Sequence, residues 1–345
     1  MAKRPYRLHF VCNGNVFRSR IAEGYMRSFN LPNLEISSSG LSYDATYGNT
    51  HYTLSPYALD IAKKYGFQQY LSPHPTQTTQ KLIDSADLVV YLYPGVLKSA
   101  KEIFHVDERK SLVWNVPDFP DFPNWPKVGP RKRLAGIALR RIIFGGARHL
   151  KAALTHGNWV DAYDKDDQPT GLCLPVSIAN QKGLYHRGSH VVLITKDGKI
   201  LVQKRSKSQR FAPGLLDITL GGICDAGEDA KSTAVRETRE ECGLDIAGLH
   251  LIPAGTYTSY TRHSVRSVRN YHHSYIFIVH LPQENPEITL QRSEVSNIYF
   301  LSPAQLKKLI RRHSLRGYGK LNYSYSLYEK LLPQIIKHLP PTPPK

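Results

Sequence analysis

The chain has 345 residues and a mass of 39.1 kDa, which favours two domains of ordinary size over one. With 41% hydrophobic and 21% charged residues, the composition excludes a disordered, collagen-like or coiled-coil protein. The 4 cysteines are too few and too scattered for a disulfide framework. The net charge of +18 favours anionic partners such as phosphorylated metabolites, nucleic acid or acidic membrane surfaces.

The amino-terminal sequence MAKRPYRLHFVC lacks the apolar core and the cleavage site of a secretory signal. No apolar stretch approaches the length of about 20 residues that spans a bilayer. We therefore expect a soluble, cytoplasmic protein.

Strand and helix signals alternate along the first third of the chain. The pattern predicts strands over residues 7–12, 34–40 and 87–93 and helices over residues 19–29, 55–66 and 96–104. Strands that alternate with helices of this length form a parallel sheet with helices on both faces. We therefore predict an α/β fold for the first domain.

A proline-rich and then strongly basic segment follows. Residues 127–151 hold eight Lys and Arg residues and no Asp or Glu. One interpretation is the closing helix of the first domain followed by a linker. The other is a basic amphipathic surface that binds anionic lipid or nucleic acid.

The second half of the chain has a different pattern. A hairpin is predicted over residues 190–205 around the turn Asp197-Gly198. An acidic helix over 228–242, strands near 252–260 and 273–281, and a helix near 303–312 follow, and this mixture predicts an α+β sandwich. We divide the chain into a domain 1–126, a helical segment 127–155, a domain 156–338 and a disordered tail 339–345.

The first motif places a cysteine and an arginine at the two ends of a loop between a strand and a helix. Backbone N–H groups of such a loop and the helix N-terminus bind a tetrahedral dianion, and Arg18 can hold two of its oxygens. The same positive field favours the thiolate form of Cys12 as a nucleophile, and Ser19 is placed to donate a hydrogen bond to it. The predicted phosphate-binding residues are Asn13, Gly14, Asn15, Val16, Phe17, Arg18 and Ser19.

This chemistry needs a general acid for the leaving oxygen, and a base for water afterwards. Asp118 and Asp121 each stand in an Asp-Phe-Pro triplet on a proline-stiffened loop. We favour Asp118 because it follows the strand-like run SLVWNV more closely. Tyr43, Tyr47 and Tyr52 are candidate walls of the site.

Residues 5–125 resemble the low-molecular-weight protein tyrosine phosphatase family, through Cys-x5-Arg-Ser, the SSSG stretch 37–40 and the helix LSPYALDIAKKYG. The resemblance implies a flavodoxin-like fold, Asn15 as an organiser of the loop, a phosphocysteine intermediate on Cys12, and Asp118 as general acid. Thioredoxin-linked arsenate reduction is rejected because no other cysteine precedes Cys173.

The second motif is a set of carboxylates on one helix face. Glu237, Glu240 and Glu241 are three and four residues apart, and their mutual repulsion predicts divalent cations, Mg²⁺ or Mn²⁺. Glu228 is expected to fold back onto Arg236 and fix the preceding loop on the helix.

This segment resembles the Nudix box, with matches at Gly222, Glu228, Arg236, Glu237, Glu240, Glu241, Gly243 and Leu244. The resemblance implies cleavage of a diphosphate. It implies that Glu237, Glu240 and Glu241 are metal ligands and that Glu240 is also a catalytic residue. Glu294 resembles an accessory acidic residue of the family. Flanking segments resemble the branch that includes isopentenyl diphosphate isomerase. Isomerisation itself is disfavoured because Gly221 stands where that isomerase has a cysteine.

His186 and His190 have a metal-like spacing, but on a strand we favour structural roles for them. The leading hypothesis is a bifunctional hydrolase whose two sites act on phosphorylated and diphosphate-containing small molecules. In one version of this hypothesis, the product of the second site is the substrate of the first. Alternatives are a phosphatase for phosphotyrosine proteins with an independent second domain, and a basic regulatory protein that binds nucleotides or RNA.

Overall fold

The computed structural model describes residues 4–42, 54–116, 139–209, 212–263, 268–322 and 325–341. The chain divides into two compact units, residues 1–157 and residues 158–345, and each is described by itself. Asp118, Asp121, Tyr43, Tyr47, Tyr52 and residues 342–345 of the tail lie outside the described residues.

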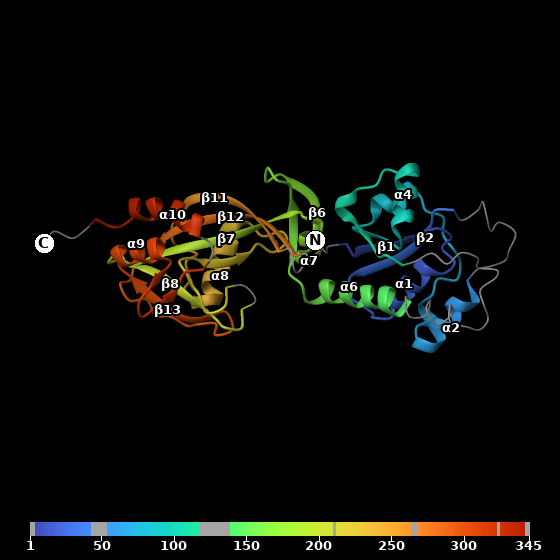
Figure 1. Cartoon of the computed structure of the whole chain (residues 1–345), viewed down its shortest axis with the longest axis horizontal. Helices are drawn as coiled ribbons and strands as arrows, with labels where there is room; N and C mark the ends of the chain where they lie inside the picture. Colours follow the sequence, from blue (N-terminus) through green and yellow to red (C-terminus); the bar gives the residue numbers. More distant parts are fainter. Residues whose placement is uncertain are drawn as a thin grey trace. The chain divides into compact units, whose positions relative to one another are not determined.

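The described part of the first unit contains a parallel sheet of four strands in the order β2-β1-β3-β4. The strands are β1 (Tyr6–Cys12), β2 (Leu34–Gly40), β3 (Leu88–Tyr91) and β4 (Ser111–Val113). The helices are α1 (Arg18–Arg27), α2 (Pro56–Tyr65), α3 (Gln80–Ser85), α4 (Pro94–Ile103) and α6 (Gly145–His156), with a π-helical turn at Leu139–Phe144. Figure 1 shows α4 on one side of this sheet and α1 with α6 on the other, as predicted for an α/β domain.

The first unit places Cys12 at the carboxyl end of β1. Cys12 pairs in register with Gly40, the last residue of β2, so the two strands end side by side. Loops at the carboxyl ends of parallel strands form the usual ligand-binding edge of such sheets. The predicted loop between strand and helix therefore lies at this edge.

Aromatic contacts attach the π-helical turn and α6 to the first unit. The Phe144 ring lies 4.1 Å from the Tyr25 ring and 5.0 Å from the Tyr65 ring, between centroids. The ammonium group of Lys151 lies 4.6 Å from the Phe29 ring centroid. The described part of the basic segment thus contacts α1 through its apolar side, while residues 127–138 lie outside the described residues.

The second unit is built on a mixed sheet. Its main path has the order β11-β12-β7-β5-β6; β10 pairs with β7, and β8 pairs with β7, β9 and β13. The strands are β5 (Trp159–Tyr163), β6 (Pro169–Pro175), β7 (Tyr185–Ile194), β8 (Ile200–Arg205), β9 (Leu216–Asp217), β10 (Leu220–Ile223), β11 (Ile252–His263), β12 (Val268–His280), β13 (Val295–Leu301), β14 (Ser314–Leu315) and β15 (Gly319–Lys320). The helices are α7 (Val176–Lys182), α8 (Ala230–Cys242), α9 (Pro303–Arg312) and α10 (Tyr325–Lys337).

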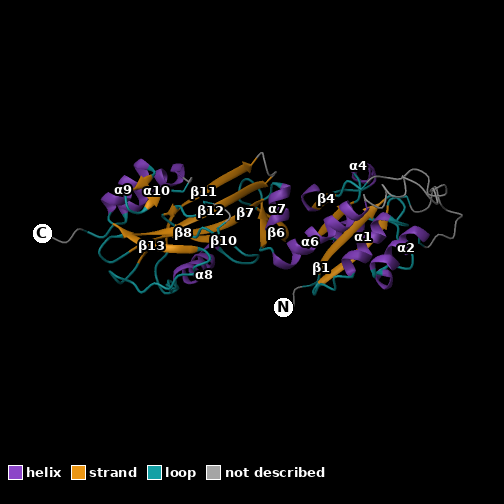
Figure 2. Ribbon diagram, turned by 60° about the horizontal axis from the view of Figure 1, so that its bottom comes forward, coloured by secondary structure: helices purple, strands orange, loops and turns teal. Residues whose placement is uncertain are grey.

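Alternation along β7 gives this sheet a hydrophobic core on both faces. Val191 and Leu193 belong to one cluster with Ala234 of α8. Val192 and Ile194 belong to another with residues of α9 and α10. Figure 2 shows α8 on one side of the sheet and α9 with α10 on the other. The predicted α+β sandwich is confirmed.

Candidate functional site

The thiol of Cys12 is held inside the loop that follows β1. Its Sγ lies 3.0 Å from the hydroxyl of Ser19, and the backbone N–H of Asn15 donates to it at 3.3 Å. The side chain is only 3% exposed. A backbone N–H and a hydroxyl therefore lie within hydrogen-bond distance of the sulfur. The contact predicted between Ser19 and the thiol is present.

Asn15 fixes the shape of this loop. Its backbone is left-handed, with φ of 49°, a conformation that asparagine adopts more readily than most residues. The side-chain amide donates to Ser19 and Ser38 at 2.8 Å each, and its oxygen accepts from the backbone N–H of Thr76 at 2.7 Å. One side chain therefore ties the loop to the end of β2 and to a distant segment.

Gly40 provides the space that the loop occupies. A Cβ at this position would lie 2.5 Å from the backbone oxygen of Asn13 and 2.6 Å from the backbone nitrogen of Asn15. Both contacts are far closer than van der Waals packing allows. Only glycine fits at the end of the SSSG stretch.

Arg18 begins α1 and lies at the far end of the loop. It is 5% exposed, and its guanidinium donates to the backbone oxygen of Val116 at 3.4 Å. Val116 is two residues before Asp118, the favoured acid. The arginine is thus in contact with the segment that follows β4 and precedes the predicted acid loop in the sequence.

His9 and Glu23 are buried polar residues that the motif did not include. His9 bonds through its two ring nitrogens to Ser37 and Ser39, at 2.7 Å each, and burial lowers its pKa from 6.5 to about 4. Glu23 accepts from Ser38 at 2.6 Å, and Arg27 lies 2.8 Å from it. These networks hold β2 against β1 and α1, behind the thiol loop. The serines of SSSG were the only sequence signal for them.

In the second unit, Arg236 binds the carboxylates of the predicted box. Its Nε and Nη2 donate to the two oxygens of Glu228 at 3.0 and 2.9 Å, so the predicted pair is confirmed. Its Nη1 donates to Glu237 at 2.8 Å and to Glu240 at 3.2 Å. The hydrogen bonds that Arg236 donates to Glu228, together with the negative charge of Glu237, raise the pKa of Arg236. The guanidinium is therefore positively charged at all ordinary pH values.

The two glycines of β10 are explained by close contacts. A Cβ on Gly222 would lie 2.3 Å from a carboxylate oxygen of Glu237. A Cβ on Gly221, where φ is 147°, would lie 2.0 Å from the backbone oxygen of Ser189. Any side chain at position 221 would therefore collide with β7.

Glu241 is the most enclosed carboxylate of the set. It is 3% exposed and accepts from the amide of Gln203 at 3.3 Å. Burial, followed by the charges of Glu237, Asp217 and Glu294, raises its pKa well above the ordinary value. Burial is also the main cause of the raised pKa of Glu237, with Glu240 and Glu294 adding to it. Glu294 therefore lies within electrostatic range of both residues.

The donor chemistry of this cluster fits a divalent cation. Several carboxylates share a partly buried space in which their pKa values are raised, and hard oxygen ligands of this kind suit Mg²⁺ or Mn²⁺. Within the described ranges, however, no three His, Cys, Asp or Glu side chains are already arranged as a metal site. Arg236 lies between Glu237 and Glu240 instead.

Asp217 is an acidic neighbour of the box that the sequence reasoning missed. Its carboxylate accepts from the amide of Asn322 at 2.6 Å, from the hydroxyl of Tyr328 at 2.8 Å, and from Thr219. Its charge contributes to the raised pKa of Glu241. Because Asn322 and Tyr328 follow it by 105 and 111 residues, no local spacing could have indicated these contacts.

Thr238 and His186 each make a hydrogen bond inside the second unit. Thr238, which stands in a hydrophobic slot of the box, is fully buried and donates its hydroxyl to the backbone oxygen of Ala234 at 2.7 Å. His186 is buried and bonds to Asn270 at 3.2 Å. His190 occupies the same face of β7 as His186, as predicted from strand alternation.

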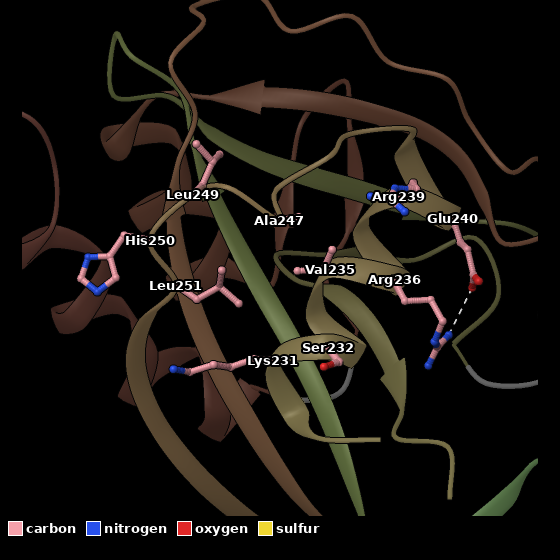
Figure 3. Close-up of a pocket in the computed structure, with 10 residues that line it drawn as sticks. All are labelled: Lys231, Ser232, Val235, Arg236, Arg239, Glu240, Ala247, Leu249, His250 and Leu251. Carbon is pink, nitrogen blue, oxygen red and sulfur yellow. Dashed lines mark hydrogen bonds and ion pairs between the residues drawn. The ribbon is translucent and has the colours of Figure 1, made fainter. Parts of the chain in front are cut away.

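An open pocket of about 700 Å³ lies along α8. Figure 3 shows Arg236 with Glu240 at one end of it and His250 at the other. Val235, Leu249 and Leu251 supply apolar surface between them. The pocket has both charged and apolar walls, and Glu240 is the carboxylate of the cluster that lines it.

Comparison with known families divides the chain in the same way. The family described as low molecular weight phosphotyrosine protein phosphatase matches residues 7–119, and the NUDIX domain family matches residues 184–318. In the part of the chain that is described, no helix has the length and apolar composition to cross a membrane.

Individual relatives match one unit or the other. The Nudix hydrolase YfcD of Salmonella typhi is 31% identical over 153 residues, which cover 44% of this chain and 77% of that protein. The structure of DR0079 from Deinococcus radiodurans is 20% identical with a TM-score of 0.39, and covers 50% of this chain and 98% of its own. That of the YwlE arginine phosphatase from Geobacillus stearothermophilus is 25% identical with a TM-score of 0.34, and covers 44% and 97%. The chain therefore belongs to the Nudix hydrolase family and carries an amino-terminal low-molecular-weight phosphotyrosine phosphatase domain.

Proposed function

We propose that this protein is a bifunctional hydrolase, with a cysteine-dependent phosphomonoesterase in the first unit and a metal-dependent pyrophosphohydrolase in the second. The observation that carries the proposal is the thiol of Cys12, bonded to Ser19 at 3.0 Å and to the N–H of Asn15 at 3.3 Å.

In the proposed first reaction, the thiolate of Cys12 attacks phosphorus while the bond from phosphorus to the ester oxygen breaks. The leaving oxygen takes a proton from Asp118, or from Asp121 as the alternative. Water, deprotonated by the same carboxylate, then attacks the phosphocysteine and releases phosphate and the thiolate. Arg18 and the N–H groups of residues 13–19 would bind the phosphoryl oxygens.

In the proposed second reaction, Glu237, Glu240 and Glu241 hold Mg²⁺ or Mn²⁺. When bound, the cation neutralises the diphosphate and lowers the pKa of water. Arg236 would keep Glu237 and Glu240 in place, since it contacts both of them and Glu228. Glu294 would contribute further negative charge. The pocket along α8 has room for a group attached to the diphosphate.

The products of the second reaction are phosphomonoesters, which are the substrate class of the first. We therefore propose that the two reactions can act in sequence on one metabolite, in the cytoplasm. The group attached to the diphosphate belongs to one of several classes, which include nucleotide sugars, ADP-ribose, dinucleoside polyphosphates and prenyl diphosphates.

Two substitutions in the full chain test this proposal. Cys12→Ser should abolish metal-independent hydrolysis of p-nitrophenyl phosphate and spare the metal-dependent reaction. Glu241→Gln should lower release of monophosphate from a diphosphate panel with Mg²⁺ by roughly 100-fold and spare the first reaction. Mass spectrometry would show which diphosphate is cut and whether a monoester accumulates in the Cys12→Ser protein.

Matched controls are Cys173→Ser and Glu329→Gln, a half-buried thiol and an exposed carboxylate in the second unit outside the proposed sites. Both controls should keep both activities. Retained phosphatase activity in Cys12→Ser would remove the cysteine from the mechanism. If either substitution lowered both reactions equally, the proposal of separate sites would be wrong.

A further inference from the structure

The hairpin of β5 and β6 contacts the loop that leads into α8, although the hairpin lies outside the segment that matches the NUDIX family. That match begins at residue 184, whereas β5 ends at Tyr163 and β6 ends at Pro175. β5 pairs with β6 and joins the rest of the sheet where Tyr163 pairs with Tyr185 of β7. The hairpin is therefore an extension of the family segment that reaches one of its functional loops.

The loop between β10 and α8, residues 224–228, finds two hydrogen-bond acceptors on β5. The backbone N–H of Ala226 donates to the backbone oxygen of Trp159 at 2.8 Å. The backbone N–H of Gly227 donates to Oδ2 of Asp161 at 2.7 Å. Gly227 has φ of 80°, a left-handed conformation that favours glycine, so the chain turns at the residue that Asp161 holds. β5 therefore fixes the two residues that precede Glu228.

Glu228 connects this loop to the carboxylates of α8. It accepts from the backbone N–H of Asp225 at 3.2 Å and from Nε and Nη2 of Arg236 at 3.0 and 2.9 Å. The same guanidinium donates through Nη1 to Glu237 and Glu240, and Figure 3 shows the second of these contacts. A continuous series of contacts thus runs from β5 to two of the proposed metal ligands.

Negative charge does not explain a carboxylate at position 161. The loop that Asp161 contacts already contains Asp225 and Glu228, and like charges repel one another at short range. A hydrogen bond to a carboxylate is stronger than one between neutral groups, and this strength offsets the repulsion. The side chain at position 161 therefore serves as an acceptor for the N–H of Gly227, which an uncharged amide oxygen can also do.

We propose that Asp161 is a positioning residue of the second site, because it holds the loop in the shape in which Glu228 binds Arg236. The inference rests on the proposed pyrophosphohydrolase and extends its site to a strand outside the family segment. Without this acceptor, the N–H of Gly227 bonds to water and the loop is free to move away from Arg236. The guanidinium then holds Glu237 and Glu240 less firmly, and their affinity for a cation falls.

The test is binding of Mn²⁺ to the full chain without substrate, measured from the electron paramagnetic resonance signal of free Mn²⁺. Asp161→Ala should weaken binding about tenfold, the lower end of the loss expected when a residue that supports metal ligands is removed. Asp161→Asn keeps an oxygen for the N–H of Gly227 and should bind Mn²⁺ like the wild type. Asp166→Ala is the matched control, an exposed carboxylate in the turn of the same hairpin, and should leave binding unchanged.

A double-substitution cycle shows whether Asp161 acts through Glu228. In the Glu228→Ala protein the loop is no longer tied to Arg236, so Asp161→Ala should cause no further loss of Mn²⁺ affinity there. Far-UV circular dichroism checks that each variant folds. Asp161→Asn is decisive even if Asp161→Ala does not fold, because a loss of Mn²⁺ affinity in Asp161→Asn would assign the role to charge and overturn the proposal.

The remaining outcomes separate this inference from the function on which it rests. Full Mn²⁺ affinity in Asp161→Ala would refute the positioning role and leave the proposed metal-dependent reaction intact. An undiminished effect of Asp161→Ala in the Glu228→Ala protein would refute the route through Glu228. If the wild type bound no Mn²⁺, the proposed second reaction would itself be wrong, and the role of Asp161 would be refuted with it.

Discussion

Gly40 shows how a single hydrogen atom in place of a methyl group sets the geometry around Cys12. The backbone of residues 13–15 passes so close to Gly40 that a Cβ would lie 2.5 Å from the oxygen of Asn13. The atoms in the way are backbone atoms, which cannot rotate aside like the end of a side chain. The N–H groups expected to bind phosphate belong to this same stretch.

We predict that Gly40→Ala lowers kcat for p-nitrophenyl phosphate about 100-fold or more, because displaced N–H groups no longer point at the phosphoryl oxygens. The control is Gly145→Ala, since a Cβ on Gly145 meets nothing within 4 Å. Steady-state kinetics on both variants provide the measurement. Normal kcat in Gly40→Ala would mean that the loop tolerates a shift and does not depend on its observed shape.

His9 predicts a specific dependence of stability on pH. Burial lowers its pKa from 6.5 to about 4, so between these values the unfolded chain binds a proton that the folded chain does not. The free energy of unfolding of the first unit therefore decreases as the pH falls through this window, by about 1.4 kcal/mol per pH unit from this residue. Above the window, His9 is neutral in both states and contributes no slope.

The measurement is urea unfolding of wild type and His9→Gln at pH 6.5 and pH 5. Across this interval the wild type should lose about 2 kcal/mol more than the variant, whose side chain does not titrate. Other groups titrate in both proteins, so the difference between the two slopes isolates His9. Equal slopes would contradict the assignment.

The sequence motifs correctly predicted contacts between side chains that are close together in the sequence. The contact from Ser19 to the Cys12 thiol and the pair between Glu228 and Arg236 both follow from spacing along one loop or helix. His9 was not predicted, because its partners Ser37 and Ser39 are brought to it by the register of β1 and β2. Register between distant strands depends on the whole sheet.

At the scale of elements, the close contact of β10 with α8 orders the carboxylates of the second site. Glu237 lies so near Gly222 that a Cβ would be 2.3 Å from its Oε1. Arg236 donates a hydrogen bond to the same oxygen at 2.8 Å. The strand and the helix together leave Glu237 little freedom.

We predict that Gly222→Ala moves Glu237 and lowers the affinity for Mg²⁺ in the diphosphate reaction roughly 10- to 100-fold. Gly248→Ala, where a Cβ meets nothing within 4 Å, should change neither affinity nor rate. Initial rates over a range of Mg²⁺ concentration separate an effect on metal binding from general loss of activity. An unchanged Mg²⁺ dependence in Gly222→Ala would show that the position of Glu237 is not critical.

Helices were predicted correctly where the hydrophobic pattern was long and where residues such as glycine or proline marked its ends. The predicted helix 55–66 appears as α2, and Gly66 ends it with φ of 74°. The helix predicted at 303–312 appears as α9. In contrast, α10 was not predicted, because Pro333 interrupts its pattern. The proline is tolerated in a helix that packs Leu331 and Ile335 into the core.

At the scale of the whole molecule, the chain separates into two compact units that divide between Gly157 and Asn158. The α/β pattern followed by a mixed pattern was sufficient to predict both folds and their order. The acid loop could be predicted only as a choice between Asp118 and Asp121, because proline-rich segments have no periodicity that fixes a side-chain direction. These two residues lie outside the described ranges.

The bonds from Asn322 and Tyr328 to Asp217 join residues that are synthesised more than 100 positions apart. The described sheet and helices of the first unit are all encoded before residue 157, so a ribosome has delivered them long before it finishes. Asp217 of the second unit, in contrast, acquires these two hydrogen-bond partners only after residues 322 and 328 have been synthesised. Newly made chains should therefore pass through a stage in which the first unit is assembled and Asp217 of the second unit still lacks Asn322 and Tyr328.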